Sequence, residues 1–482
     1  MESAFMSFTR AVAHNTIVQT IGKAISTLLG LITFALLARY LGQEGYGHYY
    51  TVLSYLGFFS VLADFGLYII VARELGRKEK PEGEILGNLL ALRLVLAFII
   101  LSIGIVLSLF FPYPGVVKIS ILVGAANFLF IAVIQLLVGL FQAHLNTFWV
   151  VFGEIIGRLV VIGLVLLIIS NAGALPWIIA AVVLGSFSNF VIMLLATRRF
   201  VRLSLKFDMV YWRYILRETF PIAVSVILNL IYFRLDTILL SIFQPASEVG
   251  LYGAAYKILE ILVTFPNMFI GLILPVLSYW ALHDTDRFRR IFQRAFDLLI
   301  AGGLPLVIGG LWLAEPIIVL ISGQEFAAAA PVFQLLLFAV FSLFLGSLSG
   351  HAIVAIGKQR VMVWVYLCIA VLGIGVYLLL IPIFSFYGAA FGTILTETLS
   401  MSVGYFIILR NKRFTLNIWG VGRALLASAC MSLVLWALHP YGLFINLIAG
   451  GFVYVGALLA FGGIRRDELL EIVRGRKKET EA

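Results

Sequence analysis

The stretch ILGNLLALRLVLAFIILSIGIVLSLF, residues 85–110, decides the class of the fold. It contains one charged side chain, Arg93, and is otherwise almost entirely apolar. An α-helix needs roughly 20 such residues to cross about 30 Å of hydrocarbon. A strand of a membrane barrel would instead alternate apolar and polar residues over about ten positions. The stretch therefore predicts a membrane-spanning helix.

The rest of the chain repeats this pattern. Of the 482 residues, 62% are hydrophobic and only 12% are charged, and the mean hydropathy is +1.08, which is typical of membrane proteins. We predict an all-α polytopic membrane protein with about fourteen transmembrane helices and little soluble structure. The predicted helices cover residues 14–39, 47–71, 85–110, 116–141, 148–170, 175–196, 219–243, 250–280, 296–313, 331–356, 361–381, 387–409, 418–438 and 441–461.

Lys and Arg residues concentrate on every second connection between these helices. With the N-terminus counted as inside, 27 of the 34 fall on inner segments, whereas only Arg39 and Lys118 fall on outer ones. The positive-inside rule then predicts cytoplasmic termini for a multi-pass protein of the cell membrane. Topology and attraction to anionic membrane lipids account for the net charge of +10, so no nucleic-acid partner is expected.

Several segments outside the helix cores carry further predictions. All eight tryptophans lie near helix ends, as membrane-interface anchors do. Cys368 and Cys430 lie inside apolar helices, which indicates neither a disulfide nor a metal site. The first helix is too long for a signal peptide and is expected to stay in the mature chain. Residues 208–218 and the basic tail 465–482 are expected to lie along the cytoplasmic surface of the membrane.

The chain also contains an internal repeat. Aligning Gly47 and Tyr49 with Gly250 and Tyr252 gives a shift of 203 residues. Because each repeat then holds six helices, an even number, the two halves should be parallel and related by an axis along the membrane normal. We predict an N-terminal lobe at 1–200, a C-terminal lobe at 201–412 and two peripheral helices at 413–464, with a cavity between the lobes.

Polar stripes mark the faces expected to line that cavity. In the first helix the stripe comprises Asn15, Gln19, Gly22, Lys23, Ser26, Gly30 and Thr33, and in the seventh it comprises Ser225, Asn229, Tyr232 and Asp236. These residues recur at helical steps of three or four, so each set shares one face. They are candidate polar contacts for a substrate.

Ten charged side chains lie inside the predicted helices, where a lipid-facing charge costs about 2.5–3.5 kcal/mol. Two sets can neutralise themselves within one turn and are expected to be structural pairs: Glu154 with Arg158, and Lys257 with Glu260. Lys23, Arg93 and Arg234 have no such partner on their own helix face, so they are candidates for binding an anionic substrate or for pairing with another helix. Asp64 and Glu397 are candidates for a coupling cation, and Asp64 can equally pair with one of the three cations.

The chain resembles the polysaccharide-biosynthesis (Wzx-like) flippases of the multidrug/oligosaccharidyl-lipid/polysaccharide superfamily. The similar segments are ARYLGQEGYGHYY (38–50), LADFGL (62–67), YGAAYKILEILVTFPNMFIGLILPVLS (252–278) and the basic FRRIFQRAF after it. The resemblance implies two six-helix lobes and alternating-access transport of a lipid-linked oligosaccharide from the inner to the outer leaflet. It also implies that cavity cations hold the pyrophosphate, a role that suits Lys23, Arg93 and Arg234. A glycan polymerase or glycosyltransferases are possible partners.

Three alternatives stay open: a cation-coupled multidrug exporter, a peptidoglycan-precursor flippase, and a membrane enzyme such as a polysaccharide polymerase or ligase. The short outer connections, with little charge, argue against the enzyme. The sequence contains no nucleotide-binding loop, metal cluster or nucleophile constellation, so no cofactor is expected.

Overall fold

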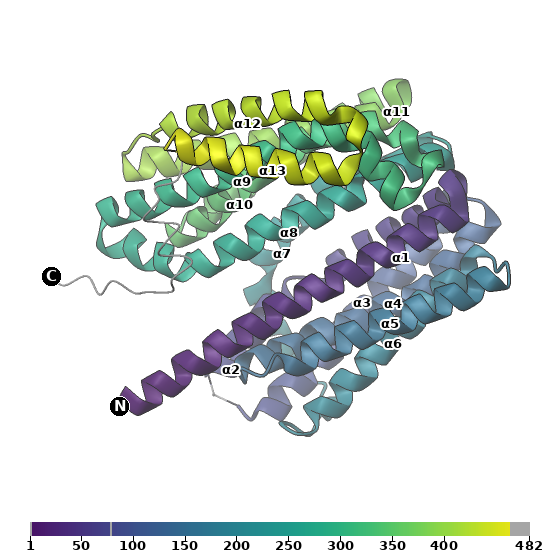
Figure 1. The fold of residues 1–482 in the computed structure, drawn as a ribbon. Helices are drawn as coiled ribbons and strands as arrows, with labels where there is room; N and C mark the ends of the chain where they lie inside the picture. The colour runs from purple at the N-terminus through teal and green to yellow at the C-terminus, as the bar shows by residue number, and fades with distance from the viewer. Residues whose placement is uncertain (1, 78–79, 463–482) are drawn as a thin grey trace. The chain divides into compact units, whose positions relative to one another are not determined.

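The computed structural model describes residues 2–77 and 80–462 (Figure 1). Within these, the backbone alone is described for residues 2–14, 16–17, 69, 72, 221–222, 225, 229 and 231–233. The predicted basic tail, 465–482, lies outside the described residues.

Every regular element in the described part of the chain is a helix. There are thirteen α-helices, with short 3-10 turns at Gln324–Ala329 and His439–Tyr441. The α-helices are α1 Glu2–Asp64, α2 Leu67–Arg77, α3 Glu82–Phe110, α4 Gly115–Ala143, α5 Phe148–Ser170, α6 Leu175–Thr197, α7 Met209–Phe243, α8 Ala246–His283, α9 Thr285–Ser322, α10 Ala330–Ala355, α11 Gln359–Lys412, α12 Trp419–Leu438 and α13 Leu443–Ala460.

Among the described residues, eleven helices are long and apolar enough to cross a membrane, which confirms the all-α membrane fold. Each of the fourteen predicted segments overlaps a helix. Two segments overlap α1 and two overlap α11, and the second segment extends past the end of α1 into α2. The backbone leaves helical geometry at Gly42 within α1 (φ +65°) and at Ser385 within α11 (φ +52°). These residues separate the first predicted segment from the second, and the eleventh from the twelfth.

The second predicted helix, 47–71, is interrupted in the structure. Phe65 and Gly66 both have positive φ, 48° and 75°, so α1 ends at Asp64 and the separate helix α2 begins at Leu67. Left-handed backbone is unfavourable for a bulky residue such as phenylalanine. The sequence LADFGL therefore encodes a break inside an apolar run rather than a continuous helix.

The segment 208–218 also differs from the prediction of a separate surface helix. Asp208 caps the start of α7 by accepting hydrogen bonds from the backbone N–H groups of Tyr211 (3.1 Å) and Val210 (3.0 Å), and these bonds lower the pKa of its carboxyl group. From there α7 runs without interruption to Phe243. Trp212 and Ile215 are buried in an apolar cluster, so this segment packs against the protein.

The chain forms two compact units. Unit 1 comprises residues 1–253, 321–325 and 374–389, and unit 2 comprises 254–320, 326–373 and 390–482. The predicted boundary at residue 200 follows the sequence repeat, whereas unit 1 also includes α7, which packs against α1 and α3. The lobe boundaries at 200 and 412 stay a prediction.

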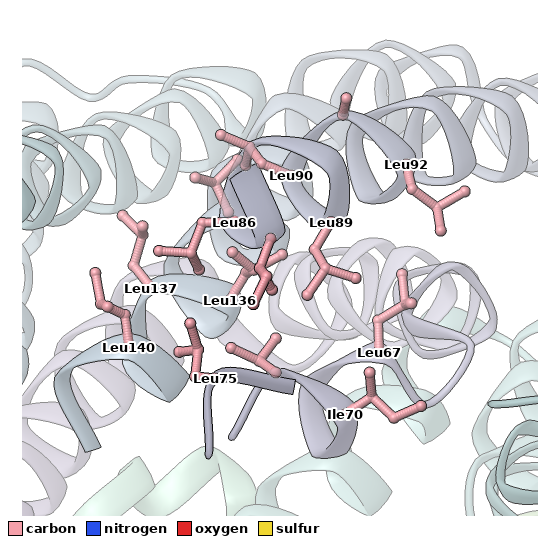
Figure 2. Close-up of a cluster of buried hydrophobic side chains, with 14 of the residues drawn as sticks. Leu67, Ile70, Leu75, Leu86, Leu89, Leu90, Leu92, Leu136, Leu137 and Leu140 are labelled. Carbon is pink, nitrogen blue, oxygen red and sulfur yellow. The ribbon is translucent and has the colours of Figure 1, made fainter. Parts of the chain in front are cut away.

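In unit 1, a leucine-rich cluster packs α2 against α3 and α4 (Figure 2). It joins Leu67, Ile70 and Leu75 of α2 to leucines of α3 and α4, among them Leu86, Leu89, Leu136 and Leu140. Tight packing of this kind, rather than transfer out of water, is the main source of stability between helices in lipid. The cluster therefore fixes α2 beside the break at Phe65 and Gly66.

In unit 2, helices α12 and α13 are tied to α9 by polar contacts. The indole of Trp312 donates a hydrogen bond of 2.7 Å to Ser432 in α12. The hydroxyl of Tyr454 in α13 donates one of 2.7 Å to the carbonyl of Ala301. The two predicted last helices are thus integral parts of unit 2.

Candidate functional site

The polar stripe of α1 divides into two lines in the structure. One line, formed by Asn15, Gly22, Ser26 and Gly30, packs against α5. Asn15 accepts hydrogen bonds from the backbone N–H (3.1 Å) and hydroxyl (2.9 Å) of Thr147. Farther along, Gly22 lies against Val151 and Gly30 against the guanidinium of Arg158. This line is an interface between two helices.

Ser26 lies in the middle of this interface, where it is 1% exposed. Its hydroxyl donates to Glu154 and accepts from Nε of Arg158 at 2.5 Å, while Nη2 of Arg158 lies 3.3 Å from the Glu154 carboxylate. Ser26 therefore does not line an open cavity, as the sequence predicted it would, because its buried hydroxyl is hydrogen-bonded to Glu154 and Arg158. Glu154 and Arg158 form the expected pair, with Ser26 as its third member.

The second line of the stripe, Gln19 and Lys23, is exposed in the structure. Lys23 interacts electrostatically with Glu154. Glu154 and Arg158 are themselves 33% and 37% exposed at their side chains. Lys23, Glu154 and Arg158, which we call the α1–α5 charge cluster, thus present two cations and one carboxylate at an accessible surface of unit 1.

Removing the guanidinium from this cluster should weaken the packing of α1 on α5. We expect Arg158→Ala to destabilise the protein by about 1 kcal/mol, a small value because both charged side chains are about one-third exposed. The yield of monodisperse protein after detergent extraction measures the effect. The double change Arg158→Ala with Glu154→Gln should recover most of the loss, since a neutral amide needs no counter-charge, and a double variant as poor as the single one would contradict this.

Arg93 is held by two other helices. It is 1% exposed, forms an ion pair with Asp64 at the end of α1, and donates a hydrogen bond to Gln135 of α4. Nε and Nη1 of Arg93 are buried without a hydrogen-bond partner among the described residues. The sequence left two roles open for Asp64, binding a coupling cation or pairing with a cation of another helix. In the structure Asp64 pairs with Arg93. Arg93 is thus an interior residue that joins α3 to the chain break, and its expected access to a substrate is not seen here.

A cavity of about 350 Å³ lies beside this pair. Asp64 and Gln135 line it together with Ser60, Val61, Tyr68 and Val138. Gln135 was missed by the sequence analysis, although an uncharged amide inside the apolar helix α4 is a usable signal. The cavity offers a carboxylate, an amide and two hydroxyl groups, which can hydrogen-bond polar groups of a ligand.

On α7, Arg234 and Asp236 have different surroundings. Arg234 is half-buried and engaged with neighbouring groups. Asp236 is 0% exposed and accepts a hydrogen bond of 2.5 Å from the Tyr252 hydroxyl of α8 and one of 2.6 Å from the backbone N–H of Thr237. Asp236 is therefore an interior helix contact and not the open polar residue that we predicted. The side chains of Asn229 and Tyr232 lie outside the described residues.

The remaining predicted residues belong to unit 2. Lys257 and Glu260 form the expected pair, with Nζ to Oε2 at 2.9 Å. Glu397 is 6% exposed and interacts electrostatically with Tyr366. Among the described residues, no cluster of three or more His, Cys, Asp or Glu side chains could hold a metal ion.

These features define a multi-pass helical membrane protein with ion pairs inside its helices. Its chain belongs to the polysaccharide biosynthesis protein family, whose profile matches residues 12–280. The MatE profile matches residues 221–379.

Two curated proteins of Haloferax volcanii are similar to this chain. The probable low-salt glycan biosynthesis flippase Agl15 is 23% identical over 92% of this chain and 94% of its own length. The probable flippase AglR is 23% identical over 50% of this chain, and the match spans about half of its length, 53%.

Among solved structures, the lipid II flippase MurJ in an inward closed conformation has a similar fold. The TM-score is 0.74 at 16% identity, and the match covers 95% of this chain and all of the MurJ chain. At this identity the likeness concerns the fold.

Proposed function

We propose that this protein is a flippase that moves a lipid-linked oligosaccharide from the inner to the outer leaflet of the cell membrane by alternating access. The observation that carries the proposal is the family membership, together with one relative, the probable glycan biosynthesis flippase Agl15, that matches nearly the whole chain. The glycan product would feed cell-surface polysaccharide assembly, with glycosyltransferases before this step and a glycan polymerase after it as possible partners.

The α1–α5 charge cluster supports this function physically. A polyprenyl-pyrophosphate glycan has an apolar tail that can stay in lipid and an anionic, hydroxyl-rich head that cannot cross without replacement of its water contacts. Lys23 and Arg158 can supply charge-assisted hydrogen bonds to such a head. We assign Lys23 and Gln19 as exposed contacts, with Arg234 on α7 as a further candidate cation.

A cation-coupled exporter is the second candidate, and the MatE profile match over residues 221–379 favours it. Coupling requires a carboxylate that a cation can reach. Asp64 faces the 350 Å³ cavity and is 18% exposed. Asp64 is paired with Arg93 in this structure. A coupling cation would therefore have to displace Arg93 from the Asp64 carboxylate.

The proposed direction of transport depends on orientation, which labelling can test. Because positive charge is concentrated on every second connection, we expect single cysteines at Ser247 and Ala172 to react with an impermeant thiol reagent applied outside intact cells. A cysteine at Thr285 should react only after the cells are opened. Labelling of Thr285→Cys in intact cells would show the opposite orientation, with both termini outside.

Deletion of the gene tests the function itself. A flippase mutant should accumulate its lipid-linked saccharide on the inner leaflet, and mass analysis of extracted lipids should identify the head group. If lipid-linked saccharides stay at their normal level while resistance to cationic drugs falls, the exporter is correct and the flippase is excluded.

A further inference from the structure

The two copies of the sequence repeat meet at a pair of glycines. A Cβ atom on Gly47 of α1 would lie 1.7 Å from the carbonyl oxygen of Ala246. A Cβ atom on Gly250 of α8 would lie 2.0 Å from the carbonyl oxygen of Gln43. Real Cβ atoms do not approach other atoms this closely, so the two backbones touch at a distance that only glycine allows.

This contact is reciprocal under the repeat. The shift of 203 residues takes Gly47 to Gly250 and Gln43 to Ala246, so the first contact maps onto the second. The same shift takes Tyr50 to Gly253, and a Cβ on Gly253 would lie 2.6 Å from the Tyr50 ring. A contact that maps onto itself is what an interface between two symmetry-related copies produces. All these residues belong to unit 1.

Connections from each repeat also reach the helix end of the other repeat. Tyr113, between α3 and α4, shares a hydrogen bond of 2.8 Å with Ser241 near the end of α7. In the other direction, Gln43 donates a hydrogen bond to the carbonyl of Glu325, between α9 and α10. The α3–α4 and α9–α10 connections hold equivalent places in the two six-helix repeats, so each repeat contacts the other through the same connection, although through different residues.

All these residues lie in or beside connections that the charge distribution places outside the cell. The cross-contacts just described are uncharged hydrogen bonds and backbone approaches, which can separate without exposing an unpaired charge. A glycan head that leaves toward the outer leaflet requires the outer ends of the two repeats to part. Uncharged contacts of this kind suit a seal that opens repeatedly.

We propose that the reciprocal contact of Gly47 and Gly250, which we call the glycine crossing, is the outer closure of the transport path and parts once in each cycle. The proposal rests on the proposed function for its direction. The glycines fill no binding role. They hold α1, just beyond its break at Gly42, against the start of α8, so that the path is closed in this state.

Access to a residue beneath the crossing tests the closure. Ser54 lies one helical turn beyond Tyr50 and is 6% exposed. In a variant with Cys368→Ser and Cys430→Ser, a cysteine at Ser54 should react slowly with an impermeant thiol reagent from outside. Adding Gly250→Val should raise that rate about tenfold, which corresponds to about 1.4 kcal/mol against the closed state.

Gly271→Val is the matched control, because Gly271 lies on the same helix and no other atom lies within 4 Å of the place that a Cβ would occupy there. It should leave the rate unchanged. Equal labelling of the Gly250→Val and Gly271→Val proteins, at equal levels in the membrane, overturns the closure.

A cross-link provides the opposite perturbation and covers the case in which Gly250→Val fails to fold. Cysteines at Tyr50 and Gly253 should form a disulfide, since their side chains start within the required reach. Oxidation should slow export at least about tenfold and reduction should restore it. Export by the fully oxidised protein at the unlinked rate overturns the proposal. If the wild-type protein exports no glycan, the proposed function fails, whereas the labelling result still decides the closure.

Discussion

Replacing Arg93 with alanine should remove most of the folded protein from the membrane. The guanidinium is 1% exposed and pairs with Asp64, whose side chain is only 18% exposed, so its loss leaves a mostly buried carboxylate without its counter-charge. Breaking a buried pair on one side costs about 3–5 kcal/mol. We expect the monodisperse fraction of extracted protein to fall to a small part of the wild-type level, with a matching loss of export.

Two controls separate this effect from a simple loss of charge. Asp64→Asn added to Arg93→Gln should restore much of the folded fraction, because two neutral amides can hydrogen-bond without a counter-charge. Arg73→Ala should have little effect, since Arg73 and Glu218 form a 2.7 Å pair whose side chains are 41% and 40% exposed. An Arg93→Ala protein that folds normally but cannot export would instead indicate that Arg93 binds the substrate directly.

Replacing Lys23 should reduce transport without reducing the amount of protein. Lys23 is exposed and lies beside the Glu154–Arg158 pair, so the fold does not depend on its burial. A charge-assisted hydrogen bond to a phosphate is worth about 1.5–3 kcal/mol, equivalent to roughly 10- to 150-fold in affinity. We expect Lys23→Ala to lower export by at least about tenfold, and Lys23→Glu to lower it further by repelling the anion.

The matched control is Arg213→Ala, which removes another exposed cation, at the start of α7 and not on α1 or α5. This variant should export at the wild-type rate. Wild-type export by Lys23→Glu, at an equal protein level, would show that the cluster does not contact the substrate.

The sequence was sufficient to predict the helices because each is a long apolar run with polar ends. Each of the fourteen predicted segments overlaps a helix, and the Glu154–Arg158 and Lys257–Glu260 pairs form as their spacing requires. The break at Phe65 and Gly66 was missed, since an apolar phenylalanine gives no signal of a left-handed backbone. The leucine-rich cluster packs α2 against α3 and α4 directly after this break.

The face of each polar residue was harder to predict. Gln19, Lys23 and Ser26 share a stripe by helical periodicity, yet Ser26 is covered by α5 while the other two are exposed. Gly22, Ser26 and Gly30 recur every four residues, and small residues at that spacing are typical of close helix packing in membranes. That signal could have separated the interface line from the open line.

Partners distant in sequence could not be chosen from the sequence. Arg93, Asp64 and Gln135 come from three helices, and no spacing rule connects them. Asp236 gave the same error, because its hydrogen-bond partner Tyr252 was considered only as a member of the repeat. In both cases the three-dimensional contact determines whether a charged side chain is accessible or structural.

Translocation in a purified system shows whether this protein moves a lipid-linked saccharide across a membrane. The protein would be reconstituted into liposomes that carry a fluorescent polyprenyl-pyrophosphate saccharide, and a membrane-impermeant quencher would report which leaflet holds the head group. We expect wild-type protein to move the saccharide between leaflets at least about tenfold faster than protein-free liposomes or the Lys23→Glu variant. Equal rates in all three preparations, from protein shown to be folded, would contradict the proposed function.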